Sequence, residues 1–115
     1  MTFAEQLIAR HVNAFNARDL DALLADFTDD TSWVTGDYSV PAGGLREFFD
    51  EAMRAILPHL EIRRVIDGGQ VVAAELTETW EHQGSTRRAA LIAVFDIERG
   101  RISRAKIYRE GSADA

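Results

Sequence analysis

Apolar residues recur every three or four positions at the start of the chain, a spacing that predicts an amphipathic helix. Thr2 and Glu5 fit a capping box, in which each side chain accepts a hydrogen bond from a backbone amide of the first turn. Asp19 is the expected cap of a second, short helix, and a third helix follows Gly43-Gly44 and stops near Pro58. The buried faces of the three helices are expected to carry Phe3, Leu7, Ile8, His11, Val12 and Phe15, then Leu20, Leu23, Leu24 and Phe27, then Leu45, Phe48, Phe49, Ala52 and Ile56.

Between the second and third helices, residues 28–40 predict a short strand, a turn at Gly36-Asp37 and a second extended piece. Asp29-Asp30 is expected to close the second helix. Beyond Pro58 the pattern is that of strands, at about 60–66, 71–82, 86–97 and 101–109, with turns at Gly68-Gly69, Gln83-Gly84-Ser85 and the segment ERGR. Helices followed by consecutive long strands predict the α+β class, with a curved antiparallel sheet wrapped around the three helices. We expect one domain over residues 1–110 and a flexible tail at 111–115.

The strand at 89–95 is apolar on both of its sides. Alternate residues form two sets: Ala89, Leu91, Ala93 and Phe95, and Ala90, Ile92 and Val94. A sheet with one face in water would alternate apolar and polar residues here, so both faces are expected to be covered. The helices can cover only one of them. A homodimer interface is therefore expected on the other, formed by Ala90, Ile92, Val94, Ala105 and Ile107.

Composition narrows the class of protein without naming it. Apolar residues make up 46% of the 115 residues and charged residues 28%, as in an ordinary soluble chain. The net charge of −6 argues against nucleic acid or anionic lipid as a partner. The absence of cysteine excludes thiolate chemistry and is compatible with a reducing cytoplasm. We find no signal peptide and no membrane-spanning run, so a cytoplasmic protein is expected.

Several segments together resemble the ketosteroid isomerase group and the wider SnoaL-like and nuclear transport factor 2-like superfamily. They are NARDLDALLADFTDD after the first helix, GGLREFFDEAM in the third helix and GRISRAKIYRE at the end of the chain. The resemblance covers roughly residues 3 to 109. It implies a cone-shaped fold with an internal pocket for small, flat or apolar molecules, and it commonly implies a homodimer. It is specific for the fold and weak for the function, because this fold hosts many activities.

The steroid isomerase residues are not carried over to this sequence. By the resemblance, the general-base aspartate matches Thr35, the protonated aspartic acid matches Ala93 and the phenol donor matches His11. A threonine and an alanine cannot shuttle a proton between two carbons. Steroid isomerisation by that mechanism is therefore not expected.

The stretch ELTETWEHQG at 75–84 places one carboxylate where a core residue is expected. Read with a period of two, Glu78 lies between Leu76 and Trp80 on the inward face. The resemblance also places these three positions, with Arg104, Lys106 and Tyr108, in the pocket lining. Because an isolated buried carboxylate is costly, Glu78 must be paired, hydrogen-bonded or protonated, and Lys106 or Arg104 is the expected partner.

Two functions fit this pattern. The first is a cofactor-free acid–base enzyme of the isomerase, cyclase, dehydratase or hydrolase type, with Glu78, His11, Lys106 and Tyr108 in the chemistry. Its substrate-binding residues would be Trp33, Thr35, Leu76, Trp80, Ala93 and Arg104. The second is a non-catalytic domain that binds a small ligand or dimerises, with Glu78 in a structural ion pair and His11 and the tryptophans in an ordinary core. Neither function uses a metal, because the three histidines lack metal-ligand spacing.

Overall fold

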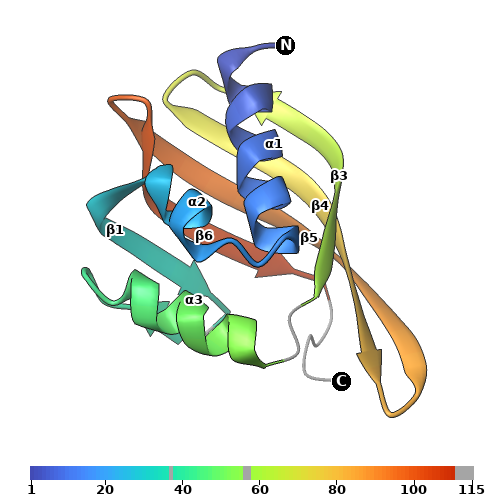
Figure 1. Cartoon of the computed structure of the whole chain (residues 1–115). Coiled ribbons are helices and arrows are strands. Elements are labelled where there is room, and N and C mark those ends of the chain that lie inside the picture. The colour runs from blue at the N-terminus through green and yellow to red at the C-terminus, as the bar shows by residue number, and fades with distance from the viewer. Residues whose placement is uncertain (37, 56–57, 111–115) are drawn as a thin grey trace.

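Three helices pack against one face of a six-stranded sheet (Figure 1). The computed structural model describes residues 1–36, 38–55 and 58–110. The expected turn residue Asp37, the helical position Ile56 and the tail at 111–115 lie outside these ranges. The predicted α+β class is confirmed. The elements are α1 (Phe3–Asn16), α2 (Leu20–Ala25), β1 (Phe27–Thr35), β2 (Tyr38–Val40), α3 (Leu45–Arg54), β3 (His59–Asp67), β4 (Val71–His82), β5 (Ser85–Glu98) and β6 (Arg101–Arg109).

The sheet is mixed rather than purely antiparallel. Its strands lie in the order β2-β1-β6-β5-β4-β3. All neighbours run antiparallel except β1 and β6, which pair in parallel. The predicted antiparallel sheet is therefore wrong at this one pair. β1 and β6 are separated by more than sixty residues, so the crossover that a parallel pair requires is supplied by everything between them.

The helix starts follow the capping signals in the sequence. Thr2 and Glu5 form the predicted capping box at the start of α1, and the Asp19 side chain accepts a hydrogen bond from the backbone of Ala22 in α2. The sequence analysis expected Asp29-Asp30 to close α2, and this expectation is wrong. That helix ends at Ala25, and the two aspartates lie within β1, which pairs with β6 from Phe27 onward.

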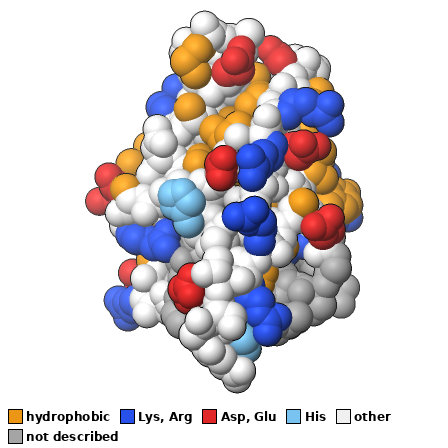
Figure 2. Space-filling view, turned by 90° about the vertical axis from the view of Figure 1, so that its right-hand side faces the viewer, with side chains coloured by type: hydrophobic (Ala, Val, Ile, Leu, Met, Phe, Trp, Pro, Cys, Tyr) orange, Lys and Arg blue, Asp and Glu red, His pale blue; other side chains and the backbone are white. Residues whose placement is uncertain are grey.

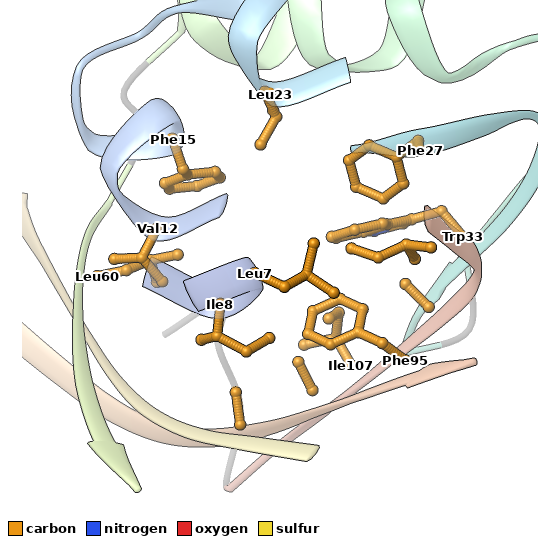
Figure 3. Close-up of a cluster of buried hydrophobic side chains, with 14 of the residues drawn as sticks. Leu7, Ile8, Val12, Phe15, Leu23, Phe27, Trp33, Leu60, Phe95 and Ile107 are labelled. Carbon is orange, nitrogen blue, oxygen red and sulfur yellow. The ribbon is translucent and has the colours of Figure 1, made fainter. Parts of the chain in front are cut away.

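The core lies between the helices and the concave face of the sheet (Figure 3). Leu7 and Ile8 of α1, Leu23 of α2 and Phe95 of β5 are fully buried in it. At the end of α1, the side-chain amide of Asn16 bonds both the carbonyl oxygen of Leu60 (2.9 Å) and its N–H (2.8 Å). These two bonds fix β3 against α1, and they hold the part of the sheet that faces Glu78, which is the cross-strand partner of Leu60.

A β-bulge in β6 decides which of its side chains face the core. Asp96 of β5 pairs with Arg104, but the next residue, Ile97, pairs with Ile102, so Ser103 is the extra residue. Ile102 is buried before the bulge, and Ala105 and Ile107 are buried after it. One extra residue moves every later side chain to the opposite face. Strict alternation from Ile102 had predicted the reverse.

Two sets of predicted site residues therefore exchange faces. Arg104, Lys106 and Tyr108 were expected in the pocket, and they lie on the convex face instead. Ala105 and Ile107 were expected at a dimer interface, and they lie in the core. The physical reason is the same for all five residues, since each follows Ser103.

The convex face of the sheet is partly apolar. Ala90, Ile92 and Val94 of β5 are each half-buried on this face, as predicted from the two-sided strand. Three large apolar side chains are more exposed: Ile66 at 43%, Val71 at 47% and Tyr108 at 48%. Toward β3 and β4, hydrophobic side chains lie beside charges of both signs (Figure 2). The face thus combines a wide apolar area with scattered ion pairs.

Candidate functional site

A buried carboxylate lies on the concave side of the sheet. Glu78 is 3% exposed, and its neighbours on the same face of β4 are Leu76 and Trp80, as predicted. Across the strands it lies opposite Ala89 of β5 and Leu60 of β3, both buried. The surroundings of Glu78 within the sheet are therefore apolar, and its charge must be balanced by a residue that reaches it from elsewhere.

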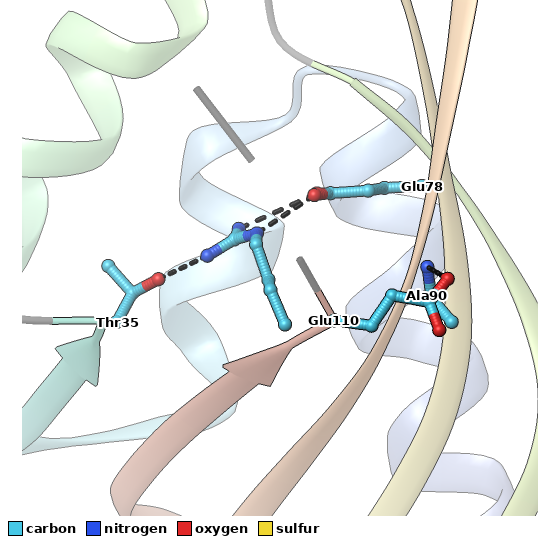
Figure 4. A network of polar contacts seen from close by, with 5 residues as sticks. Thr35, Glu78, Ala90 and Glu110 are labelled. Carbon is cyan, nitrogen blue, oxygen red and sulfur yellow. Dashed lines mark hydrogen bonds and ion pairs between the residues drawn. The ribbon is translucent and has the colours of Figure 1, made fainter. Parts of the chain in front are cut away.

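That residue is Arg109, at the end of β6. Its Nε donates to Oε1 of Glu78 at 2.8 Å, and its Nη2 lies 3.5 Å from Oε2 (Figure 4). On the other side, its Nη1 donates to the hydroxyl of Thr35 at the end of β1. The guanidinium thus joins β1 to β4 across the concave face. A bidentate contact of this kind fixes the plane of both groups as well as their distance.

The expected partners of Glu78 are wrong. Lys106 lies on the convex face with its Nζ 4.9 Å from the centre of the Tyr108 ring, and Arg104 lies 4.0 Å from Asp96. The bulge at Ser103 explains the error, because after it the odd-numbered residues of β6 face inward. Arg109 is therefore the inward-facing cation, and only the position of the bulge could have indicated this.

Glu78 retains hydrogen-bonding capacity. A carboxylate offers about four acceptor sites. Within the described part of the chain, Glu78 accepts one short bond at Oε1 and one long contact at Oε2, both from Arg109. Arg109 also has unused N–H groups, because a guanidinium carries five, and two contacts with Glu78 and one with Thr35 use three of them. An acceptor and a donor therefore remain available side by side.

His11 does not belong to this group. It is 3% exposed on α1, and its ring contacts Phe27, Trp33 and Phe95 at centroid distances of 5.8, 6.2 and 5.4 Å. Phe95 lies six residues along β5 from Ala89, the partner of Glu78. Six residues of strand span about 20 Å. Among the described residues, no hydrogen bond or ion pair joins His11 to Arg109, to Thr35 or to Glu78, with which the sequence analysis had grouped it.

The environment of His11 keeps its ring neutral. Burial lowers the pKa of His11 to about 4, and the nearby Asp26 carboxylate acts weakly in the opposite direction. Within the described residues, Nδ1 of His11 is buried without a hydrogen-bond partner. A neutral imidazole surrounded by three aromatic rings fits a core residue.

Some of the other predicted binding residues lie in the core around His11, and others lie near Glu78. Trp33 is buried against His11, Phe27 and Phe49, which makes it part of the core. Ala93 is buried on the concave face. Thr35 is linked to Glu78 by Arg109, which hydrogen-bonds both residues. Trp80 is half-buried and follows Glu78 on the inward face of β4. The sequence analysis therefore found Leu76, Trp80 and Thr35 near Glu78 and missed Arg109.

A separate groove lies on the side of the molecule formed by α2, the start of β1 and the start of α3. It has a volume of about 340 Å³, and none of its lining residues belongs to the Glu78 group. Its walls include Leu24, Phe27 and Leu45, with Asp21 and Arg46 joined at 3.1 Å at the rim. The pocket expected beside Glu78 stays a prediction.

Among the residues that the structure describes, no group of three or more histidine, aspartate or glutamate side chains is placed to hold a metal ion. In the same residues, none of the helices has the length and apolar character needed to cross a bilayer.

Comparison with known families agrees with this geometry. A family profile described as a SnoaL-like domain matches residues 8–105, which is most of the chain. The chain belongs to the SnoaL-like family. No protein with a curated functional description matches it. Its fold is also that of solved NTF2-like and ketosteroid isomerase-like proteins.

Three solved structures illustrate the likeness of this SnoaL-like chain. A putative polyketide cyclase from Pseudomonas putida is 24% identical, with a TM-score of 0.81 over 99% of this chain and 94% of that chain. An LEH-like epoxide hydrolase from M. tuberculosis is 19% identical, with a TM-score of 0.82 over 94% and 83%. TerC, co-crystallised with polyporic acid, is 18% identical, with a TM-score of 0.82 over 93% and 91%. At these identities the likeness is one of fold.

The neutral state of His11 predicts a loss of stability in acid. An unfolded histidine takes up a proton near pH 6.5, whereas folded His11 resists protonation until about pH 4. Its contribution to stability is therefore complete above pH 6.5 and is lost as the pH falls toward 4. Between pH 7 and pH 5 we expect the free energy of unfolding to fall by about 2 kcal/mol through this residue.

Urea unfolding at several pH values measures this effect. His11→Leu should remove the fall between pH 7 and pH 5, and His59→Gln, at an exposed histidine on β3, should leave it unchanged. A wild-type protein and a His11→Leu variant with parallel pH dependence would contradict the assignment.

Proposed function

We propose that this SnoaL-like protein is a cofactor-free acid–base enzyme that acts on a small, partly apolar molecule, with Glu78 as the proton acceptor. The observation that carries the proposal is the unused acceptor capacity of a buried carboxylate that is held in place by a single guanidinium. Oriented carboxylates in apolar surroundings are common acid–base groups in enzymes. A purely structural ion pair would gain from having all of its hydrogen-bonding sites satisfied.

Arg109 supplies the complementary group. In the proposed reaction, a C–H bond next to a carbonyl group breaks, its proton passes to Glu78, and the electron pair moves to the carbonyl oxygen. The free N–H groups of Arg109 stabilise that oxygen as negative charge develops on it.

Thr35 has a positioning role in this scheme. Its hydroxyl accepts a hydrogen bond from Arg109, and so it holds the guanidinium on the side opposite Glu78. Thr35 cannot replace the base of a steroid isomerase, because a threonine hydroxyl is a far weaker base than a carboxylate. Solved structures of the same fold include proteins described as a putative polyketide cyclase and an LEH-like epoxide hydrolase, so an enzymatic role is compatible with this fold.

One observation favours the alternative function, a non-catalytic domain that binds a small ligand. The ring of His11 contacts those of Phe27, Trp33 and Phe95, and Figure 3 shows these three aromatic rings packed in the core between α1 and the sheet. A ligand on the concave face would therefore lie near Glu78 rather than beside His11. A shallow site of that kind also suits a binding domain, in which Glu78 and Arg109 would only orient a ligand.

Replacing the proton acceptor separates the two functions. Hydrogen–deuterium exchange at the α-carbons of a panel of enolisable cyclic ketones in D₂O, followed by NMR, reports proton abstraction directly. The Glu78→Gln variant keeps the shape of the side chain and removes the base. We expect its exchange rate to fall by about 10² to 10⁴, the usual effect of one positioned acid–base group.

The matched control is Glu75→Gln. Glu75 lies on the same strand but on the convex face, where it pairs with Arg64 at 3.2 Å. Its variant should exchange the ketones at the wild-type rate. Equal rates for wild type and Glu78→Gln would refute the catalytic role of Glu78 and leave the binding function.

We further propose that the protein is a homodimer formed through the convex face of the sheet. The apolar area of Ala90, Ile92 and Val94 continues into the exposed side chains of Val71 and Tyr108. Apolar patches of several hundred Å² are rarely left in water on a monomer. Ala105 and Ile107 take no part, because both lie in the core.

Sedimentation velocity at tens of micromolar tests the dimer. Ile92→Glu places a charge in the middle of the patch, and we expect it to give a monomer or an aggregate. Asn13→Glu, on the exposed side of α1, should sediment as the wild type does. A monomeric wild type would count directly against the interface.

A further inference from the structure

The β4–β5 hairpin extends the concave face beyond Glu78. Trp80 follows Glu78 on the inward side of β4, and its cross-strand partner on β5 is Arg87. The pairing of these two strands runs without a bulge, so Trp80 and Arg87 face the same way as Glu78. Directly opposed residues have their β-carbons about 5 Å apart. The side chains of Trp80 and Arg87 therefore start side by side on the face of the hairpin that carries Glu78.

Arg87 has no partner of its own in the described part of the chain. It is exposed and takes part in none of the ion pairs or hydrogen bonds found there. Arg109, by contrast, is already paired with Glu78. Of these three side chains on the concave side, two are guanidinium groups and one is a carboxylate, so the charge of Arg87 is not balanced by Glu78.

This local charge is opposite to that of the whole protein. The chain has a net charge of −6, so an anionic small molecule is repelled at long range. A guanidinium free of other contacts provides the charge-assisted hydrogen bonds that a carboxylate or enolate needs. The half-buried ring of Trp80 provides a flat apolar surface beside it.

We propose that Arg87 and Trp80 form a specificity subsite that selects a flat, aromatic, anionic substrate. Arg87 pairs with the anionic group, Trp80 packs against the ring system, and the far end of the molecule reaches Glu78. Trp80 and Glu78 are two residues apart on one face of β4, a distance of about 7 Å. A fused bicyclic ring spans this distance. The inference rests on the proposed function of Glu78 and adds the class of substrate.

The sequence provides a matched pair of variants. Arg88 adjoins Arg87, is also exposed, and takes part in no ion pair or hydrogen bond among the described residues. It pairs with Thr79 and so faces the convex side. Arg87→Gln and Arg88→Gln therefore remove the same charge from the same strand, and only the first removes it from the proposed subsite.

Binding of 2-naphthoate and of its neutral analogue 2-naphthamide tests the proposal by NMR titration of the full chain. The protein has two tryptophans, so the two indole N–H signals are assigned with one Trp80→Phe spectrum. We expect naphthoate to shift the Trp80 signal and not that of buried Trp33. Arg87→Gln should weaken naphthoate binding about tenfold, and Arg88→Gln should leave it within about twofold. Naphthamide should bind more weakly and respond to neither variant.

Any one of four results would overturn the proposal. They are equal binding of naphthoate and naphthamide, equal effects of the two arginine variants, a response at Trp33 alone, and no binding of naphthoate. Glu78→Gln should retain naphthoate binding to within a few-fold, since the anionic group lies at Arg87. The arginine variants therefore test the subsite, whereas the exchange assay tests the catalytic role of Glu78, so the two proposals can be refuted separately.

Discussion

The ion pair between Glu78 and Arg109 is the interaction on which the organisation of the concave face depends. A carboxylate that is 3% exposed among apolar neighbours is stable only with a charge partner in good geometry. The partner comes from the last residue of the last strand and crosses β5 to reach β4. Because the same guanidinium also bonds Thr35, one side chain joins strands that are distant in the sequence. The site exists only once the whole sheet has formed.

Much of this fold was predictable from the sequence, because local rules determine it. The capping box of Thr2 and Glu5, the cap at Asp19 and the hairpin turns at Gly68-Gly69, Gln83-Gly84 and Arg99-Gly100 follow from short-range chemistry, and all are present. The inward position of Glu78 follows from a period of two along β4, a strand whose pairing with β5 has no bulge. Where the period is uninterrupted, face assignments from sequence are correct.

The failures share one cause. Nothing in the sequence around Ser103 indicates a bulge, and the residue lies between Ile102 and Arg104 in an otherwise regular strand. The bulge is a property of pairing with β5 and β1, so it depends on tertiary structure that local reasoning does not include. Because the bulge was not foreseen, the sequence analysis assigned Lys106 and Tyr108 to the wrong face and did not identify Arg109. The parallel pairing of β1 with β6 was missed for the same reason, since it is a contact between distant segments.

Within the described part of the chain, His11 takes no part in the hydrogen bonds of Glu78 and Arg109. His11 lies among three aromatic rings with a pKa of about 4, so near neutral pH it neither carries a charge nor exchanges protons readily. The proposed chemistry is therefore assigned to the end of the concave face where Glu78, Arg109 and Thr35 meet. This SnoaL-like chain keeps the fold of its family.

A double-mutant cycle on the stability of Glu78→Gln, Arg109→Met and the combined variant tests this account most directly. Each single change leaves a polar or charged group without its partner, whereas the double change removes both groups. Denaturant unfolding should therefore give a coupling free energy of about 1 to 3 kcal/mol, with the double variant less destabilised than the sum of the two. Effects that add within about 0.3 kcal/mol would show that the two residues are energetically independent, and would contradict the account.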